Sequence, residues 1–396
     1  MSDPAPNILW IVTTQWRAQA CGYMGDGNAH TPVLDALAGM SVNYAQAVTP
    51  HPFGPFARAA MLTGVPSPQN GVQDYYDPLP PLAPTVAHAL SAYGYQTAFF
   101  GKWHLAPRDP QAPLVGEVHA RTLVPASHRG GFEFWEGFES GFLINDPWLH
   151  GTRLPKPVQY HGYQSDVVCE RAAEFLSRET KPWFGVVSLE SPHPPYDAPA
   201  GKVSPMAATD VRLRCNVPAV AADRASRELA GYYAHITATD AAIGRLLSAV
   251  GEDTVVVFTS VHGDMHGSHG LFRKGWPHEE SVRVPLLVRH PGLAAGRNDE
   301  TVSLLDFPAM TQAWAVGATW VCPRDHAVIS MPSVVNLPDQ CDREWRGVRT
   351  ARHKLILQAD GEPWLLYDLV TDPDELHNLV ADPSARADLN RLRNLV

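Results

Sequence analysis

The sequence lacks three features that would assign it quickly to a class of protein: paired cysteines, a long apolar run and a block of basic residues. Its five cysteines, at positions 21, 169, 215, 322 and 341, are dispersed with no Cys-x-x-Cys spacing. This pattern argues against a disulfide framework and against the common cysteine zinc sites, and it favours reduced thiols. The net charge of -10 and the absence of any basic stretch argue against nucleic acid as a partner.

The N-terminus, MSDPAPNILWIVTT, has no basic region, and its apolar run is only a few residues long. It predicts neither a signal peptide nor a membrane span, so we expect a cytoplasmic protein without a membrane partner. The chain has 396 residues, of which 45% are hydrophobic and 18% are charged. This length and composition suit one large α/β domain with a smaller appendage.

Apolar runs alternate with helical patterns along most of the chain. The predicted strands are 7–12, 96–100, 183–189, 254–260 and 285–289, and the predicted helices are 31–39, 58–63, 85–93, 165–178 and 226–250, the last with Ser226 as N-cap. The alternation predicts an α/β fold in which helices sandwich a large, mostly parallel sheet.

The C-terminal part of the chain reads differently, because 346–357 and 363–369 have the pattern of paired short strands. We therefore predict a large α/β domain at 1–300 and a small α+β subdomain with short antiparallel strands at 301–396. Polar motifs at 13–17, 101–104 and 261–264 each follow a predicted strand of the large domain. Ligands of such folds bind beyond the carboxyl ends of the strands, so we expect the site there.

Several longer motifs make the chain resemble one protein family. They are NILWIVTTQWRA at 7–18, RAAMLTG at 58–64, GKWHL at 101–105, GFEFWEGF at 131–138, SPHPPY at 191–196, the segment 259–292 that begins with TSVHGD, and YDLVTDPDELHNL at 367–379. In number, order and spacing they resemble the sulfatases of the alkaline phosphatase superfamily, and the phosphonate monoester hydrolases among them. The resemblance covers nearly the whole length and implies an alkaline phosphatase-like fold.

The resemblance also implies positions for a metal ion and a nucleophile, and this sequence departs from the pattern at three of them. Family members hold a divalent cation with carboxylates and an Asn, His or Gln, and the cation binds a cysteine-derived formylglycine. Here the nucleophile position is Gly54, and two carboxylate positions are Thr14 and Val261, with Gln15 and His262 as neutral neighbours. A hard dication needs anionic oxygen ligands, so we expect no metal and no other cofactor.

The positions that contact the anionic group of the substrate in the family remain basic. They are Arg58, Lys102, His104, His193 and Lys274. With the carboxylates gone, we expect an electropositive pocket that binds a small molecule bearing a sulfate, phosphate or carboxylate. Gln15, Thr14 and Gly54 complete the predicted binding set. A structural role is a strong rival explanation for Arg58, because the neighbouring family positions have changed.

The segment VHGDMHGSHG carries His262, His266 and His269, whose spacing would suit one face of a helix. Its glycines make a helix unfavourable, so a histidine zinc site ranks below a structural explanation.

The altered positions leave several functions in competition. The first is a metal-independent enzyme or binder acting on a small anion, in which His104, His193 and His262 serve as acid or base and Lys102 stabilises negative charge. The second is a non-catalytic pseudoenzyme or partner subunit. The third is a conventional sulfuric or phosphoric ester hydrolase. A homo-oligomer is compatible with all of these.

Overall fold

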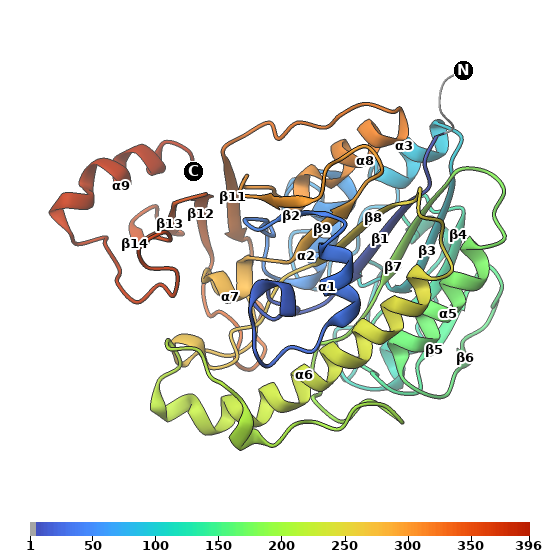
Figure 1. Ribbon diagram of the computed structural model, residues 1–396, viewed down its shortest axis with the longest axis horizontal. Coiled ribbons are helices and arrows are strands. Elements are labelled where there is room, and N and C mark those ends of the chain that lie inside the picture. Colours follow the sequence, from blue (N-terminus) through green and yellow to red (C-terminus); the bar gives the residue numbers. More distant parts are fainter. Residues whose placement is uncertain (1–4) are drawn as a thin grey trace.

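The computed structural model describes residues 5–396, and its centre is a ten-stranded sheet (Figure 1). The strand order is β10-β2-β9-β8-β1-β7-β3-β4-β5-β6. The strands are β1 (Ile8–Thr13), β2 (Val42–Tyr44), β3 (Gln96–Lys102), β4 (Phe134–Phe138), β5 (Trp148–Gly151), β6 (Val158–Gln159), β7 (Trp183–Ser188), β8 (Val255–Ser260), β9 (Leu286–Arg289) and β10 (Gly296–Asn298). Strands β8, β1, β7, β3 and β4 are parallel, and β9 runs antiparallel to both of its neighbours.

Helices cover both faces of this sheet (Figure 1). They are α1 (Pro32–Ala38), α2 (Gly54–Thr63), α3 (Val86–Ala92), α4 (Glu117–Ala120), α5 (Gln164–Leu176), α6 (Ala219–Leu247), α7 (Glu279–Val282), α8 (Phe307–Ala315) and α9 (Arg386–Arg393). The side chains of β1 alternate between two cores: Trp10 packs with α2, α3 and α8, while Ile11 packs with α1, α5 and α6. The predicted fold class is therefore confirmed.

A second sheet of four antiparallel strands lies at the C-terminal end of the chain (Figure 1). It consists of β11 (His326–Met331), β12 (Trp345–Thr350), β13 (His353–Gln358) and β14 (Pro363–Asp368), and α9 packs against β13. This agrees with the predicted C-terminal subdomain. Helix α8 follows residue 300 but packs against α2 and α3 of the large domain, so the boundary at 300 stays a prediction.

Two helices begin earlier than the sequence indicates. Helix α6 starts at Ala219 after Pro218, and Ser226 lies inside it, because the alanine-rich turns before Ser226 are also helical. Helix α2 starts at Gly54, with a proline in its first turn. None of the helices within 5–396 is long and apolar enough to cross a membrane.

Candidate functional site

The loops that follow β1, β3, β7 and β8 meet at one edge of the sheet and contribute to a cavity of about 350 Å³. Seven of the predicted site residues line it: Thr14, Gly54, Lys102, His104, His193, His262 and Lys274. Apolar side chains such as Leu114, Phe142 and Leu337 make up much of the remaining wall. The cavity therefore has a polar side, built from strand ends, and an apolar side.

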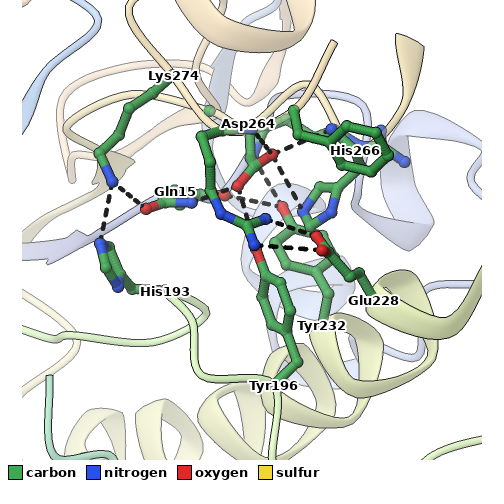
Figure 2. Close-up of polar contacts among 12 residues, drawn as sticks. Gln15, His193, Tyr196, Glu228, Tyr232, Asp264, His266 and Lys274 are labelled. Carbon is green, nitrogen blue, oxygen red and sulfur yellow. Dashed lines mark hydrogen bonds and ion pairs between the residues drawn. The ribbon is translucent and has the colours of Figure 1, made fainter. Parts of the chain in front are cut away.

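Lys274 is joined to the loop after β1 by a chain of hydrogen bonds (Figure 2). Its Nζ donates to Gln15 Oε1 at 2.5 Å and to His193 Nε2 at 3.0 Å, and Gln15 Nε2 donates to Asp264 Oδ2. Burial, with Lys102 and Arg273 nearby, lowers the pKa of Lys274 to about 7, although Asp264 opposes the shift. The amide of Gln15 is thus engaged at both ends.

Asp264 is the buried anion at the end of this chain (Figure 2). Its Oδ1 accepts from the backbone N–H groups of His266 at 3.0 Å and Arg273 at 3.1 Å, and its Oδ2 accepts from Tyr196 Oη at 3.1 Å. Burial alone would raise its pKa, but the charges of His266 and Arg273 and these hydrogen bonds outweigh burial and lower the pKa to about 2. Asp264 holds the 264–273 loop in place.

A carboxylate outside the predicted set of site residues lies beside Lys102. Glu190, in the loop after β7, forms an ion pair with Lys102, and both side chains are buried. The Lys102 ammonium also lies 4.6 Å from the centre of the Phe142 ring, and burial lowers the pKa of Lys102 to about 8. The expectation of basic residues without carboxylates beside them is therefore wrong. An acidic residue directly after a buried strand was the signal that could have revealed Glu190.

The ring of His104 is oriented by an arginine outside the recognised motifs. Arg108 Nη1 lies 2.6 Å from His104 Nε2, and a guanidinium can only donate, so Nε2 accepts and the ring proton is on Nδ1. That Nδ1 is buried and has no hydrogen-bond partner between residues 5 and 396. A Cβ added to Gly54 would lie 3.2 Å from it. The glycine therefore leaves room for a donor that faces the start of α2.

The other two histidines are fixed by backbone carbonyls. Nδ1 of His193 donates to Pro194 O at 2.7 Å, and Nδ1 of His262 donates to Gly263 O at 2.8 Å. In the described part of the chain, Nε2 of His262 is buried without a partner. Burial and nearby cations lower the pKa of all three histidines well below the usual value. They are neutral near pH 7, which removes the expected positive charge of His104 and His193 and weakens the acid–base assignment.

Arg58 does not line the cavity. Its guanidinium donates to Ser188 Oγ at 2.6 Å, to Lys102 O at 3.2 Å and to Thr14 Oγ1 at 2.8 Å, which links the ends of β7, β3 and β1. Burial lowers its pKa to about 10. These contacts support the structural explanation for Arg58 rather than direct contact with a ligand.

At the two positions where family members carry metal-binding carboxylates, one side chain here is already hydrogen-bonded and the other is apolar. Thr14 Oγ1 donates to Leu189 O at 3.0 Å and accepts from Arg58, while Val261 is fully buried in the apolar core. Among the described residues, the only group of His, Cys, Asp and Glu with converging ligand atoms is His269, His278 and Glu375, and none of these lines the cavity.

The group of His269, His278 and Glu375 does not have the geometry of a metal site. The rings of His269 and His278 are stacked with centroids 4.1 Å apart and an interplanar angle of 17°, so the in-plane lone pairs of the two rings do not meet at one point. Both oxygens of Glu375 are occupied, because one pairs with Lys354 at 2.5 Å and the other accepts from Glu279 N at 2.7 Å. His262, His266 and His269 are not brought together as a zinc site.

The sequence model of the Sulfatase family matches residues 6–318. The chain belongs to the sulfatase family. It is 32% identical to the ulvan-active sulfatase of Formosa agariphila over 419 residues, which cover 98% of this chain and 79% of that protein. It is 28% identical to the choline-sulfatase of Rhizobium meliloti, over 98% of this chain and 85% of that one.

The fold is similar to that of the phosphonate monoester hydrolase of Agrobacterium radiobacter, with a TM-score of 0.74 and 22% identity. This similarity covers 98% of our chain and 94% of the hydrolase. The fold that the resemblance predicts, which the phosphonate monoester hydrolases share, is therefore confirmed.

Proposed function

We propose that this sulfatase-family protein binds a small molecule with a sulfate, phosphate or carboxylate group, and that it uses neither a formylglycine nucleophile nor a divalent metal. The observation that carries the proposal is the bond from Lys274 Nζ to Gln15 Oε1 at 2.5 Å. The side chain of Gln15, at a family position next to the metal, is thus hydrogen-bonded to Lys274 and Asp264 of this chain instead of being directed at a cation.

The remaining family ligands support the same conclusion. Thr14 is engaged by Leu189 and Arg58, and Val261 has no donor atom. Among the four family ligand positions 14, 15, 261 and 262, only His262 has a buried side-chain nitrogen, Nε2, without a hydrogen-bond partner in the described structure. One neutral nitrogen does not suit calcium or magnesium, which prefer several oxygen ligands. These residues do not fit the family metal.

The groups that would bind the anion converge at the start of α2. Gly54 carries no side chain that could act as a nucleophile, and the N-terminus of the ten-residue helix α2 favours negative charge. His104 Nδ1–H and the Lys274 ammonium add donors from two other segments. An oxyanion in the space above Gly54 would accept from His104 Nδ1–H, which has no partner in the described structure, and from the N–H of Lys274 that Gln15 and His193 do not use. The apolar walls of the cavity suit the rest of the ligand.

A metal-independent enzyme is the second candidate. It is favoured by Lys274, because an amine with a pKa of about 7 can accept and return a proton near neutral pH. Lys274 is therefore a better acid–base group than the three neutral histidines. A partner subunit that binds no ligand and a conventional ester hydrolase are the remaining alternatives.

The test combines metal content, binding and turnover in the same preparation. The protein is incubated with calcium, magnesium, manganese and zinc, desalted and measured by elemental mass spectrometry. Binding of inorganic sulfate is measured by calorimetry with and without a chelator, and hydrolysis of an aryl sulfate is followed. We expect less than one metal per chain, sulfate binding that the chelator does not change, and no metal-dependent turnover. Stoichiometric metal with chelator-sensitive turnover would show a conventional sulfatase instead.

A further inference from the structure

A second cavity, of about 420 Å³, is lined by arginines from separate parts of the chain. Arg17 follows β1, Arg212 and Arg214 precede α6, and Arg283 follows α7. None of these residues lines the first cavity. Such a cluster is unexpected in a chain whose net charge is -10.

Two of the four arginines are paired with carboxylates. Arg214 Nε lies 3.0 Å from Glu280 and its Nη2 pairs with Asp374, while Arg283 Nε lies 3.4 Å from Glu279. Arg17 and Arg212 form no ion pair within residues 5–396. The cavity therefore contains two guanidinium groups whose charge is not directly balanced.

Arg17 is the more unusual of the two, because its side chain is only 2% exposed. Its Nη2 donates to Tyr233 Oη at 3.1 Å, but its Nε is buried without an acceptor in the described part of the chain. Both amide atoms of Gln19, which also lines the cavity, are buried and have no hydrogen-bond partner there. A buried cation and a buried amide are costly when unpaired, and a bound anion would accept hydrogen bonds from Arg17 Nε and from Gln19 Nε2.

The charge of Asp26 favours the charged form of Arg17, but neither acidic side chain of the cavity forms an ion pair with Arg17 or Arg212 in the described structure, because both are engaged elsewhere. Asp26 accepts from Tyr233 Oη at 2.5 Å and from Asn28 N at 2.9 Å. Asp374 accepts from Arg214 and from Cys215 Sγ at 3.1 Å. The two carboxylates hold the walls of the cavity and leave Arg17 and Arg212 available.

We propose that this cavity is a second anion-binding site, which takes a tetrahedral oxyanion between Arg17 and Arg212 with Gln19 as a further donor. The planar guanidinium group matches the oxygens of such an ion. Gly27 allows the approach of Arg212, because a Cβ at this position would lie 2.9 Å from Arg212 Nη1. The proposal is independent of the function assigned to the first cavity.

The test is calorimetric titration of the full chain with inorganic sulfate. Arg212→Gln removes the exposed arginine of the second cavity without disturbing the buried Arg17, and Lys274→Met removes the ammonium of the first cavity. Arg178→Gln is the matched control, because Arg178 is an exposed arginine in the segment after α5 and lines neither cavity. Thermal unfolding is recorded for every variant.

We expect two sulfate sites in the wild type and in Arg178→Gln. Arg212→Gln should weaken one site about tenfold or more, as the loss of a charge-assisted hydrogen bond predicts, while that site persists in Lys274→Met. The proposal is overturned if Lys274→Met abolishes all sulfate binding, or if Arg212→Gln binds like the control. If the wild type has one site that only Arg212→Gln weakens, the second cavity is confirmed and the function proposed for the first cavity fails.

Discussion

Replacement of Lys274 by methionine should make the protein more stable at neutral pH while it weakens anion binding. The pKa of Lys274 falls from 10.5 to about 7 on folding, chiefly because of burial. At about 1.4 kcal/mol per pKa unit, the folded state loses as much as about 5 kcal/mol when it must keep this lysine charged. Methionine has similar length and no charge, so the variant avoids this cost.

The pH dependence follows from the direction of the shift. The folded protein releases the Lys274 proton near pH 7, whereas the unfolded chain keeps it up to about pH 10.5. The unfolded state thus binds more protons between these values, and the stability of the wild type rises with pH. The free-energy cost of keeping Lys274 charged in the folded state is fully present below pH 7 and disappears toward pH 10.5. Between pH 6 and pH 9 the stability difference between variant and wild type should shrink by about 3 kcal/mol.

The loss of the hydrogen bonds to Gln15 and His193 reduces the gain by about 1 kcal/mol each, but this loss is a constant offset and leaves the pH dependence intact. The assay is urea unfolding of both proteins at several pH values, with Lys181→Met as the control because Lys181 is exposed. Sulfate affinity is measured on the same samples. A stability difference that does not change with pH, or one equal to that of the control, would refute a buried, charged Lys274.

Three further outcomes are expected. Sulfate affinity in the first cavity should fall as the pH rises from 6 to 9, because Lys274 loses its proton in this range. Calorimetry at constant ionic strength measures the affinity, and an affinity that does not change with pH would contradict the role of Lys274 in anion binding. Gly54→Ala should weaken sulfate binding severalfold by crowding His104, without loss of thermal stability, whereas Gly39→Ala at the end of α1 should not. In the wild type, nitrogen NMR of the His104 imidazole should show Nε2 as the single unprotonated nitrogen, because Arg108 donates to it. Arg108→Met removes this donor, so the variant should show a mixture of the two neutral forms of the ring.

The sequence alone was sufficient for the fold class and for the edge of the sheet at which the first cavity lies. Parallel strands buried on both faces appear as continuous apolar runs, as in 7–12 and 254–260, and the motifs that follow such strands must meet where the strands end. The start of α6 was misplaced because Ser226 looks like a cap, although the residues before it are also helix formers.

Only the tertiary structure decided how the polar side chains pair. The sequence shows that Gln15, Lys102 and Lys274 are present, but not that Lys102 meets Glu190 or that Lys274 bonds to Gln15. Charge, pKa and ring protonation depend on neighbours a few ångströms away, and these come from segments far apart in the chain. The second cavity is the extreme case, since residues near 17, 212 and 283 meet there without any shared motif, because the fold brings their loops together.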